Sequence, residues 1–162
     1  MRKMFSVLVS ILIMVWCGIS AGGEIGVQQL LDERAVSELI YQYAYNWDGK
    51  NPDGLVSIFT KDCVFEILAP DGNAEVRHNG RDALRAFAAD RFKTVLADRQ
   101  TRHHKLNTVF LETGDNKILT KTMVLTVHIV NGEKKVVNSR NIEHEFSKAS
   151  GKWLIKRRTI RK

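Results

Sequence analysis

The sequence is poor in cysteine, with only two among 162 residues. Cys17 falls in the N-terminal residues 1–22, which we expect to be removed, so Cys63 is the only cysteine expected in the mature chain and an internal disulfide is excluded there. The domain must therefore be held together by its hydrophobic core, which a chain of this length can build. Cys63 lies in an apolar stretch, which predicts a buried structural thiol rather than a nucleophile.

The sequence also has no internal repeat, low-complexity tract or long linker. Hydrophobic residues make up 44% and charged residues 27% of the chain, which is ordinary for a globular protein and excludes a disordered one. We therefore expect a single domain over residues 23–162.

The N-terminal residues 1–22 have the three parts of a signal peptide. Arg2 and Lys3 precede an apolar run over residues 5–16, and small residues follow over 18–22. The run is short for a membrane span, although an uncleaved membrane anchor is the alternative. The pattern predicts an exported protein, periplasmic or secreted, that meets a membrane only if this segment is not cleaved.

Apolar residues at helical spacing predict a first helix over residues 27–48, with a buried stripe made of Val36, Leu39, Ile40, Tyr43 and Trp47. Asn51 and Pro52 predict the start of a short second helix, and a third helix follows Gly80.

Residues 62–68 and 75–78 are rich in strand-forming side chains. Turn residues such as Asn131-Gly132 then separate four longer predicted strands over 101–111, 117–130, 134–147 and 152–160. Helices followed by such strands predict an α+β fold, in which a long N-terminal helix and two shorter helices pack on a curved, mainly antiparallel sheet. The space between them would be a conical, mostly apolar pocket for a small apolar molecule.

The sheet has more apolar surface than the helices can cover. The predicted strands over 117–130 and 134–147 carry apolar residues on both sides. An uncovered apolar face usually meets a partner, so we expect a homodimer or another small homo-oligomer.

The C-terminus is basic, and the chain has a formal net charge of +7. Trp153, Leu154 and Ile155 are interleaved with the basic residues and are typical of a core strand. We therefore interpret the basic side chains as a solvated face of that strand and expect no nucleic-acid partner. These cations are Lys152, Lys156, Arg157, Arg158, Arg161 and Lys162.

Several short motifs occur together in a characteristic order. They are residues 43–50 (YAYNWDGK), Gly80-Arg81, Arg102-His103-His104 with Asn107, and residues 151–155 (GKWLI). Their order and spacing, from about Asp32 to Ile160, resemble the SnoaL-like domains of the nuclear transport factor 2-like superfamily. That superfamily includes scytalone dehydratase, polyketide cyclases and steroid isomerase relatives, and also members without catalytic activity.

The resemblance implies a site in the cone without cofactor or metal. By position, Asp48 would match the proton-transferring Asp near the end of the first helix, and His104 and His128 would match His residues on the sheet. Tyr43 would match a Tyr five residues before that Asp. One position departs from the pattern, because many relatives carry an Asp where this chain has His144.

The residues themselves support these roles unevenly. Asp48 at a helix C-terminus faces the negative end of the helix dipole, and with partial burial its pKa would rise, which suits a general acid or base. A plain Asp-Gly turn is the alternative for Asp48. Tyr43 lies on the buried stripe, where simple core packing explains it equally well.

The histidines are harder to place from the sequence. His103 and His104 are adjacent in a predicted strand and point to opposite faces, and we favour His104 for the pocket. Strand alternation places His128 with Thr122, Val124 and Thr126, toward solvent or a partner, whereas the resemblance favours the pocket.

Two classes of function remain open from the sequence. The first is a cofactor-independent lyase or isomerase that moves a proton on a small apolar cyclic substrate. The second is a non-catalytic module for ligand binding or assembly. A non-haem iron site made of Asp48, His104 and His128 is a minor alternative, because no tight ligand spacing supports it. The enzyme hypothesis gains if Asp48 and His104 both point into one enclosed pocket, and in this form it fails if either lies outside that pocket.

Overall fold

The computed structural model describes residues 26–162, so the expected signal peptide lies outside the described residues. Three helices, α1 (Val27–Asp48), α2 (Pro52–Ser57) and α3 (Arg81–Lys93), precede or interrupt the strands. The strands are β1 (Phe59–Leu68), β2 (Ala74–Asn79), β3 (Gln100–Thr113), β4 (Lys117–Val130), β5 (Glu133–Ala149) and β6 (Lys152–Arg161). Within these residues, no helix is long and apolar enough to cross a membrane.

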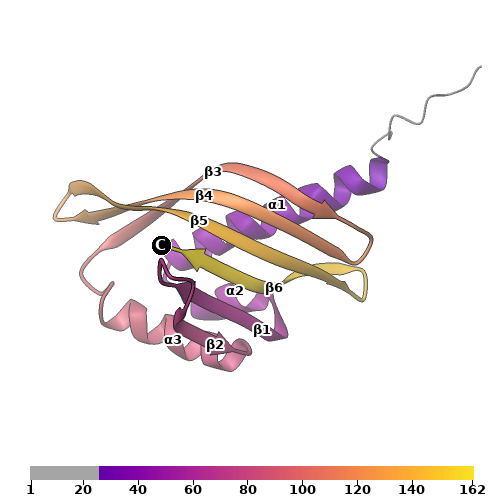
Figure 1. Ribbon diagram of the computed structural model, residues 1–162. Coiled ribbons are helices and arrows are strands. Elements are labelled where there is room, and N and C mark those ends of the chain that lie inside the picture. The colour runs from indigo at the N-terminus through magenta and orange to yellow at the C-terminus, as the bar shows by residue number, and fades with distance from the viewer. Residues whose placement is uncertain (1–25) are drawn as a thin grey trace, which may run out of the picture.

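The six strands form one curved, open sheet in the order β2-β1-β6-β5-β4-β3, and the helices lie on its concave side (Figure 1). All neighbouring pairs are antiparallel except β1 and β6, which run parallel. The predicted α+β fold, with a long helix on a mainly antiparallel sheet, is confirmed. The strands at both ends of the sheet, β2 and β3, are edges.

Helix α1 crosses the concave face and supplies the core stripe that its spacing predicts. Val36, Ile40 and Tyr43 are buried in the core, together with Phe59 and Phe146 from the sheet. Cys63 belongs to the same core and is buried, as expected for a structural thiol.

The N-terminal half of α1 is fixed to the sheet by one buried carboxylate. Asp32 Oδ1 accepts a hydrogen bond of 2.8 Å from Trp153 Nε1 and another of 2.8 Å from Lys148 Nζ. The hydrogen bonds from Lys148, followed by that from Trp153, lower the pKa of Asp32, so the carboxylate stays ionised and the contact persists at neutral pH.

The start of α3 is set by the Gly80-Arg81 pair. Gly80 has a φ of 85°, a conformation that side chains other than glycine rarely adopt, and its N–H donates to the Cys63 carbonyl at 2.7 Å. Arg81 Nε then donates to the Phe59 carbonyl at 2.7 Å. These contacts tie α3 to β1, and α3 forms the wall opposite β3 and β4.

The hairpin that joins β4 to β5 projects beyond the helices (Figure 1). Its turn is Asn131-Gly132, with a φ of 50° at Asn131 and 81° at Gly132, as the hairpin signal predicts. Side chains near this turn therefore lie outside the space that the helices enclose.

Candidate active site

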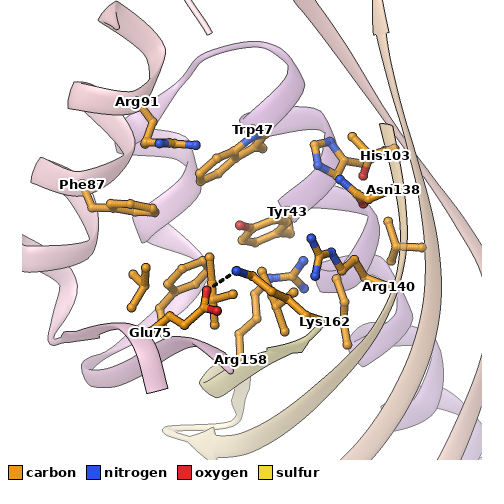
Figure 2. Close-up of a pocket in the computed structure, with 17 residues that line it drawn as sticks. Tyr43, Trp47, Glu75, Phe87, Arg91, His103, Asn138, Arg140, Arg158 and Lys162 are labelled. Carbon is orange, nitrogen blue, oxygen red and sulfur yellow. Dashed lines mark hydrogen bonds and ion pairs between the residues drawn. The ribbon is translucent and has the colours of Figure 1, made fainter. Parts of the chain in front are cut away.

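A cavity of about 380 Å³ lies between the helices and the concave face of the sheet. This volume is within the range of roughly 300–1,000 Å³ that is typical of small-molecule sites. Apolar walls come from α1, α3, β1 and β6, and polar side chains enter from β3, β5 and the C-terminus (Figure 2). The residues that line it include Tyr43, Trp47, Phe65, Glu75, Phe87, Arg91, His103, Asn138, Arg140, Arg158 and Lys162.

Asp48, the last residue of α1, makes three hydrogen bonds to the edge strand β3. Its Oδ1 lies 2.6 Å from His103 Nδ1 and 2.7 Å from Thr101 Oγ1, and its Oδ2 accepts from the His103 N–H at 2.8 Å. Gln100 Nε2 donates to the Asp48 carbonyl at 2.7 Å, which satisfies one carbonyl of the helix end. Asp48 is therefore a partly buried anchor between helix and sheet, not a free turn residue.

The pKa of Asp48 in its contact with His103 differs from the expected value in direction. Burial of the carboxyl raises the pKa of Asp48, but the hydrogen bonds from His103 and Thr101 outweigh this effect and leave the pKa below its ordinary value. The expected rise in the pKa of Asp48 was therefore wrong, because the helix dipole and burial are overcome by three donors.

His103 stays neutral beside this carboxylate. Burial lowers the pKa of His103 more than the contact with Asp48 raises it. Because an ionised carboxylate can only accept, His103 must donate from Nδ1, and Nε2 is left as the basic ring nitrogen. His103 also lines the cavity (Figure 2). A neutral imidazole oriented by a buried carboxylate is the arrangement of a general base.

His104 does not share this position. Its side chain is exposed and lines a groove between α1 and the edge of the sheet, whose lining also includes Asp48 and His103. His104 and Asp48 line this open groove together, and His104 is not among the residues that line the cavity. Alternation correctly places the two histidines on opposite faces, but the face with Thr101 and His103 is the concave one.

Of the other two predicted site residues, Tyr43 lines the cavity and His128 does not. Tyr43 is 2% exposed and lines the cavity, where its ring stacks on Trp47 at a centroid distance of 5.9 Å. His128 instead lies near the end of the projecting β4–β5 hairpin, in a surface depression with Arg99 and Lys135. His128 pairs with Thr101, the strand residue that Asp48 contacts, but it is not among the residues that line the cavity.

A metal centre made of Asp48, His104 and His128 is not assembled, because Asp48 and His104 line one groove and His128 lines another depression. Over residues 26–162, no group of three or more His, Cys, Asp or Glu side chains has the geometry to hold a metal ion.

The basic C-terminal strand is divided between the two faces of the sheet. Arg157 and Arg161 form ion pairs with Glu66 and Glu143, as a solvated strand face should. Arg158 is different, since it is 1% exposed and lines the cavity. The interpretation of all six cations as a solvated face was wrong for Arg158. Simple alternation could not have singled it out, because Arg158 has the opposite parity to the buried Trp153 and Ile155, and an irregularity in the pairing of β5 with β6 switches the faces between them.

Solved structures with the same fold include several from one bacterium. A proposed scytalone dehydratase from Novosphingobium aromaticivorans has a TM-score of 0.68 and 26% sequence identity, over 82% of this chain and 84% of that one. An NTF2-like protein with a cystatin-like fold from the same bacterium has a TM-score of 0.71 and 18% identity, over 83% of each chain. A protein of unknown function from Mycobacterium tuberculosis has a TM-score of 0.72 and 21% identity, over 86% of this chain and 77% of that one.

The sequence comparison points to the same group. None of the curated proteins matches the chain. The family model of the SnoaL-like domain matches residues 28–159, which span α1 to β6. This chain therefore belongs to the SnoaL-like domain family.

Proposed function

We propose that this domain is a cofactor-independent lyase or isomerase in which His103 is the general base. The observation that carries the proposal is the 2.6 Å contact between His103 Nδ1 and Asp48 Oδ1 at the wall of the cavity. Asp48 orients the imidazole and stabilises the imidazolium that forms when Nε2 takes a proton. The solved structure with 26% identity is described as a proposed scytalone dehydratase, and dehydratases are lyases.

Tyr43 is the candidate partner acid. Burial raises the pKa of Tyr43, so its hydroxyl remains protonated at neutral pH and can donate a hydrogen bond. In Figure 2 this hydroxyl points into the space between Trp47 and the arginines. His103 removes a proton beside a carbonyl while the Tyr43 hydroxyl donates a hydrogen bond to the enolate oxygen. The imidazolium then returns the proton, to the departing hydroxyl group in a dehydration or to another carbon in an isomerisation.

The chemistry can be tested without the natural substrate by following exchange of the acidic α-protons of 2-tetralone in deuterated buffer by NMR. We expect the protein to accelerate the exchange and His103→Gln to remove roughly 10²–10⁴-fold of that acceleration, the usual contribution of a positioned base. His104→Gln is the matched control, because it alters the neighbouring residue on the opposite face, and it should leave the exchange unchanged.

The same experiment separates the two classes of function. Saturable binding of 2-tetralone without accelerated exchange would favour a non-catalytic binding module. Acceleration that survives His103→Gln would contradict the assignment of His103 as the base.

We further propose that the chain assembles as a homodimer and is exported. Exposed apolar side chains on the convex face of β3 and β4, among them Val109 and Met123, support the first proposal. The signal-like residues 1–22 support the second. Mass spectrometry of protein from the native host should find a mature N-terminus near Ala21 or Gly22, and an intact Met1 would contradict export.

A further inference from the structure

One buried cation in the cavity wall has no counter-ion among residues 26–162. Arg158 is 1% exposed, and its guanidinium carbon lies 3.7 Å from the centroid of the Tyr43 ring. Its Nε is buried without a hydrogen-bond partner, and no ion pair within residues 26–162 includes it. A buried guanidinium is normally paired with a carboxylate, because desolvation of an unpaired charge is costly.

The side chain that meets Arg158 is neutral. Arg158 Nη1 donates to Nε2 of His144, which is itself 2% exposed. Burial, followed by the nearby charge of Arg158, lowers the pKa of His144 well below its ordinary value. His144 therefore accepts one hydrogen bond but does not offset the positive charge.

Lys105 is a second basic side chain without a hydrogen-bond partner among the described residues, and it lies over the same Tyr43 ring as Arg158. Lys105 Nζ is buried without a hydrogen-bond partner among the described residues, 5.4 Å from the centroid of Tyr43. Burial and then the charge of Arg158 lower the pKa of Lys105 well below its ordinary value. Both observations indicate a positive potential at Tyr43, where the charge of Arg158 outweighs that of the Asp48 carboxylate.

The other charged side chains that line the cavity add to this excess of positive charge. The cavity is lined by four cationic side chains, Arg91, Arg140, Arg158 and Lys162, and by one carboxylate, Glu75, which is already paired with Lys162. In Figure 2 Arg140 and Arg158 both reach the cavity on the side of Tyr43. Opposite them, Trp47, Phe65 and Phe87 form an aromatic wall suited to a ring.

We infer that the cavity binds a small ring compound that carries a carboxylate, with Arg158 and Arg140 as the anion site and the aromatic wall around the ring. A ligand carboxylate would supply the missing acceptor for Arg158 Nε and balance the excess positive charge. The inference narrows the ligand class of the proposed function, but it concerns binding alone and holds whether or not His103 transfers a proton.

Benzoate and benzamide test the inference, because they share a ring and differ in charge. Titration calorimetry at constant ionic strength should show saturable binding of benzoate at least 10-fold tighter than that of benzamide. Cyclohexanecarboxylate is a second probe that tests whether the ring must be flat. If neither carboxylate binds saturably, or if benzamide binds as tightly as benzoate, the inference is overturned.

Three variants locate the site. Arg140→Gln should weaken benzoate binding at least 5-fold, and His144→Asp, which would give Arg158 an internal counter-ion, should weaken it at least 10-fold. Neither should alter benzamide binding. Arg34→Gln, at an exposed residue of α1 outside the cavity, removes the same charge and should have no effect.

Circular dichroism and melting of each variant establish that it is folded before titration. Benzoate affinity that is unchanged in both the folded Arg140→Gln and the folded His144→Asp variants would overturn the assignment of the anion site. Because these titrations involve no turnover, they are independent of the tetralone exchange, and either proposal can fail without the other.

Discussion

The Asp48 carboxylate, at the last residue of α1, lies 2.6 Å from Nδ1 of His103 on the edge strand β3. The side chains of Asp48 and His103 are only 12% and 15% exposed. This contact joins the end of the longest helix to the open edge of the sheet, and it orients a neutral imidazole at the cavity wall. The same pair therefore contributes to stability and, in the proposed function, to proton transfer.

Asp48→Asn tests the structural part of this relationship. The variant keeps the shape of the side chain but turns one of two accepting oxygens into a donor that faces other donors, so we expect a loss of about 1–3 kcal/mol in the free energy of unfolding. Relief of the unfavourable helix dipole would have the opposite sign and is smaller, at about 0.3–1 kcal/mol. Urea unfolding measures the difference. A variant as stable as the original chain would mean that these hydrogen bonds contribute little.

Two neutral histidines, the buried His144 and the partly buried His103, predict a loss of stability in mild acid. Burial is the main cause that lowers the folded-state pKa of both His103 and His144. Between the folded and unfolded pKa values the unfolded chain binds more protons, so stability is fully present above the unfolded value near about 6.5 and is lost as the pH falls below it. Each such proton contributes a slope of at most about 1.4 kcal/mol per pH unit.

His144→Gln provides the control for this pH dependence. Glutamine can still accept from Arg158 but cannot titrate, so the decline in unfolding free energy between pH 7 and pH 5 should become shallower. His104→Gln removes an exposed histidine and should leave the slope unchanged. Equal slopes in the His144 variant and the original chain would contradict the buried, neutral state of His144.

The sequence is sufficient for the fold because its helices and strands have clear periodicity. Apolar residues at helical spacing locate α1, and Asn131-Gly132 locates the β4–β5 turn. The choice between His103 and His104 is not accessible in this way, because neither face of β3 is apolar enough to identify the concave side. An irregularity between Lys105 and Thr108 then changes the alternation further along the strand.

The convex face of the sheet predicts a dimer. Val109 is 55% exposed and Leu111 60% exposed on β3, and Met123 is 42% exposed on the adjacent strand β4. We expect light scattering to give twice the mass of the mature chain, and Val109→Arg to shift the protein toward the monomer by placing a charge in the interface. Val95→Arg is the control at an exposed apolar residue after α3. A strict monomer at high concentration would contradict the proposal.

Asp32 allows stability to be separated from function, because it holds the N-terminal half of α1, away from the cavity. We expect Asp32→Asn to lower the free energy of unfolding by about 1.5–3 kcal/mol, the range for hydrogen bonds to a charged group. The lowered pKa of Asp32 means that its contribution is present above the ordinary aspartate pKa and is lost as the pH falls through the lower folded value.

A double-mutant cycle with Lys148→Met isolates the ion pair from the hydrogen bond of Trp153. Additive losses in urea unfolding would show that Asp32 and Lys148 do not interact, and would leave Trp153 as the main partner. At a temperature where the Asp32→Asn variant is folded, its tetralone exchange should match that of the original chain. A reduced exchange rate would mean that the position of α1, and with it Asp48, depends on the distant anchor at Asp32.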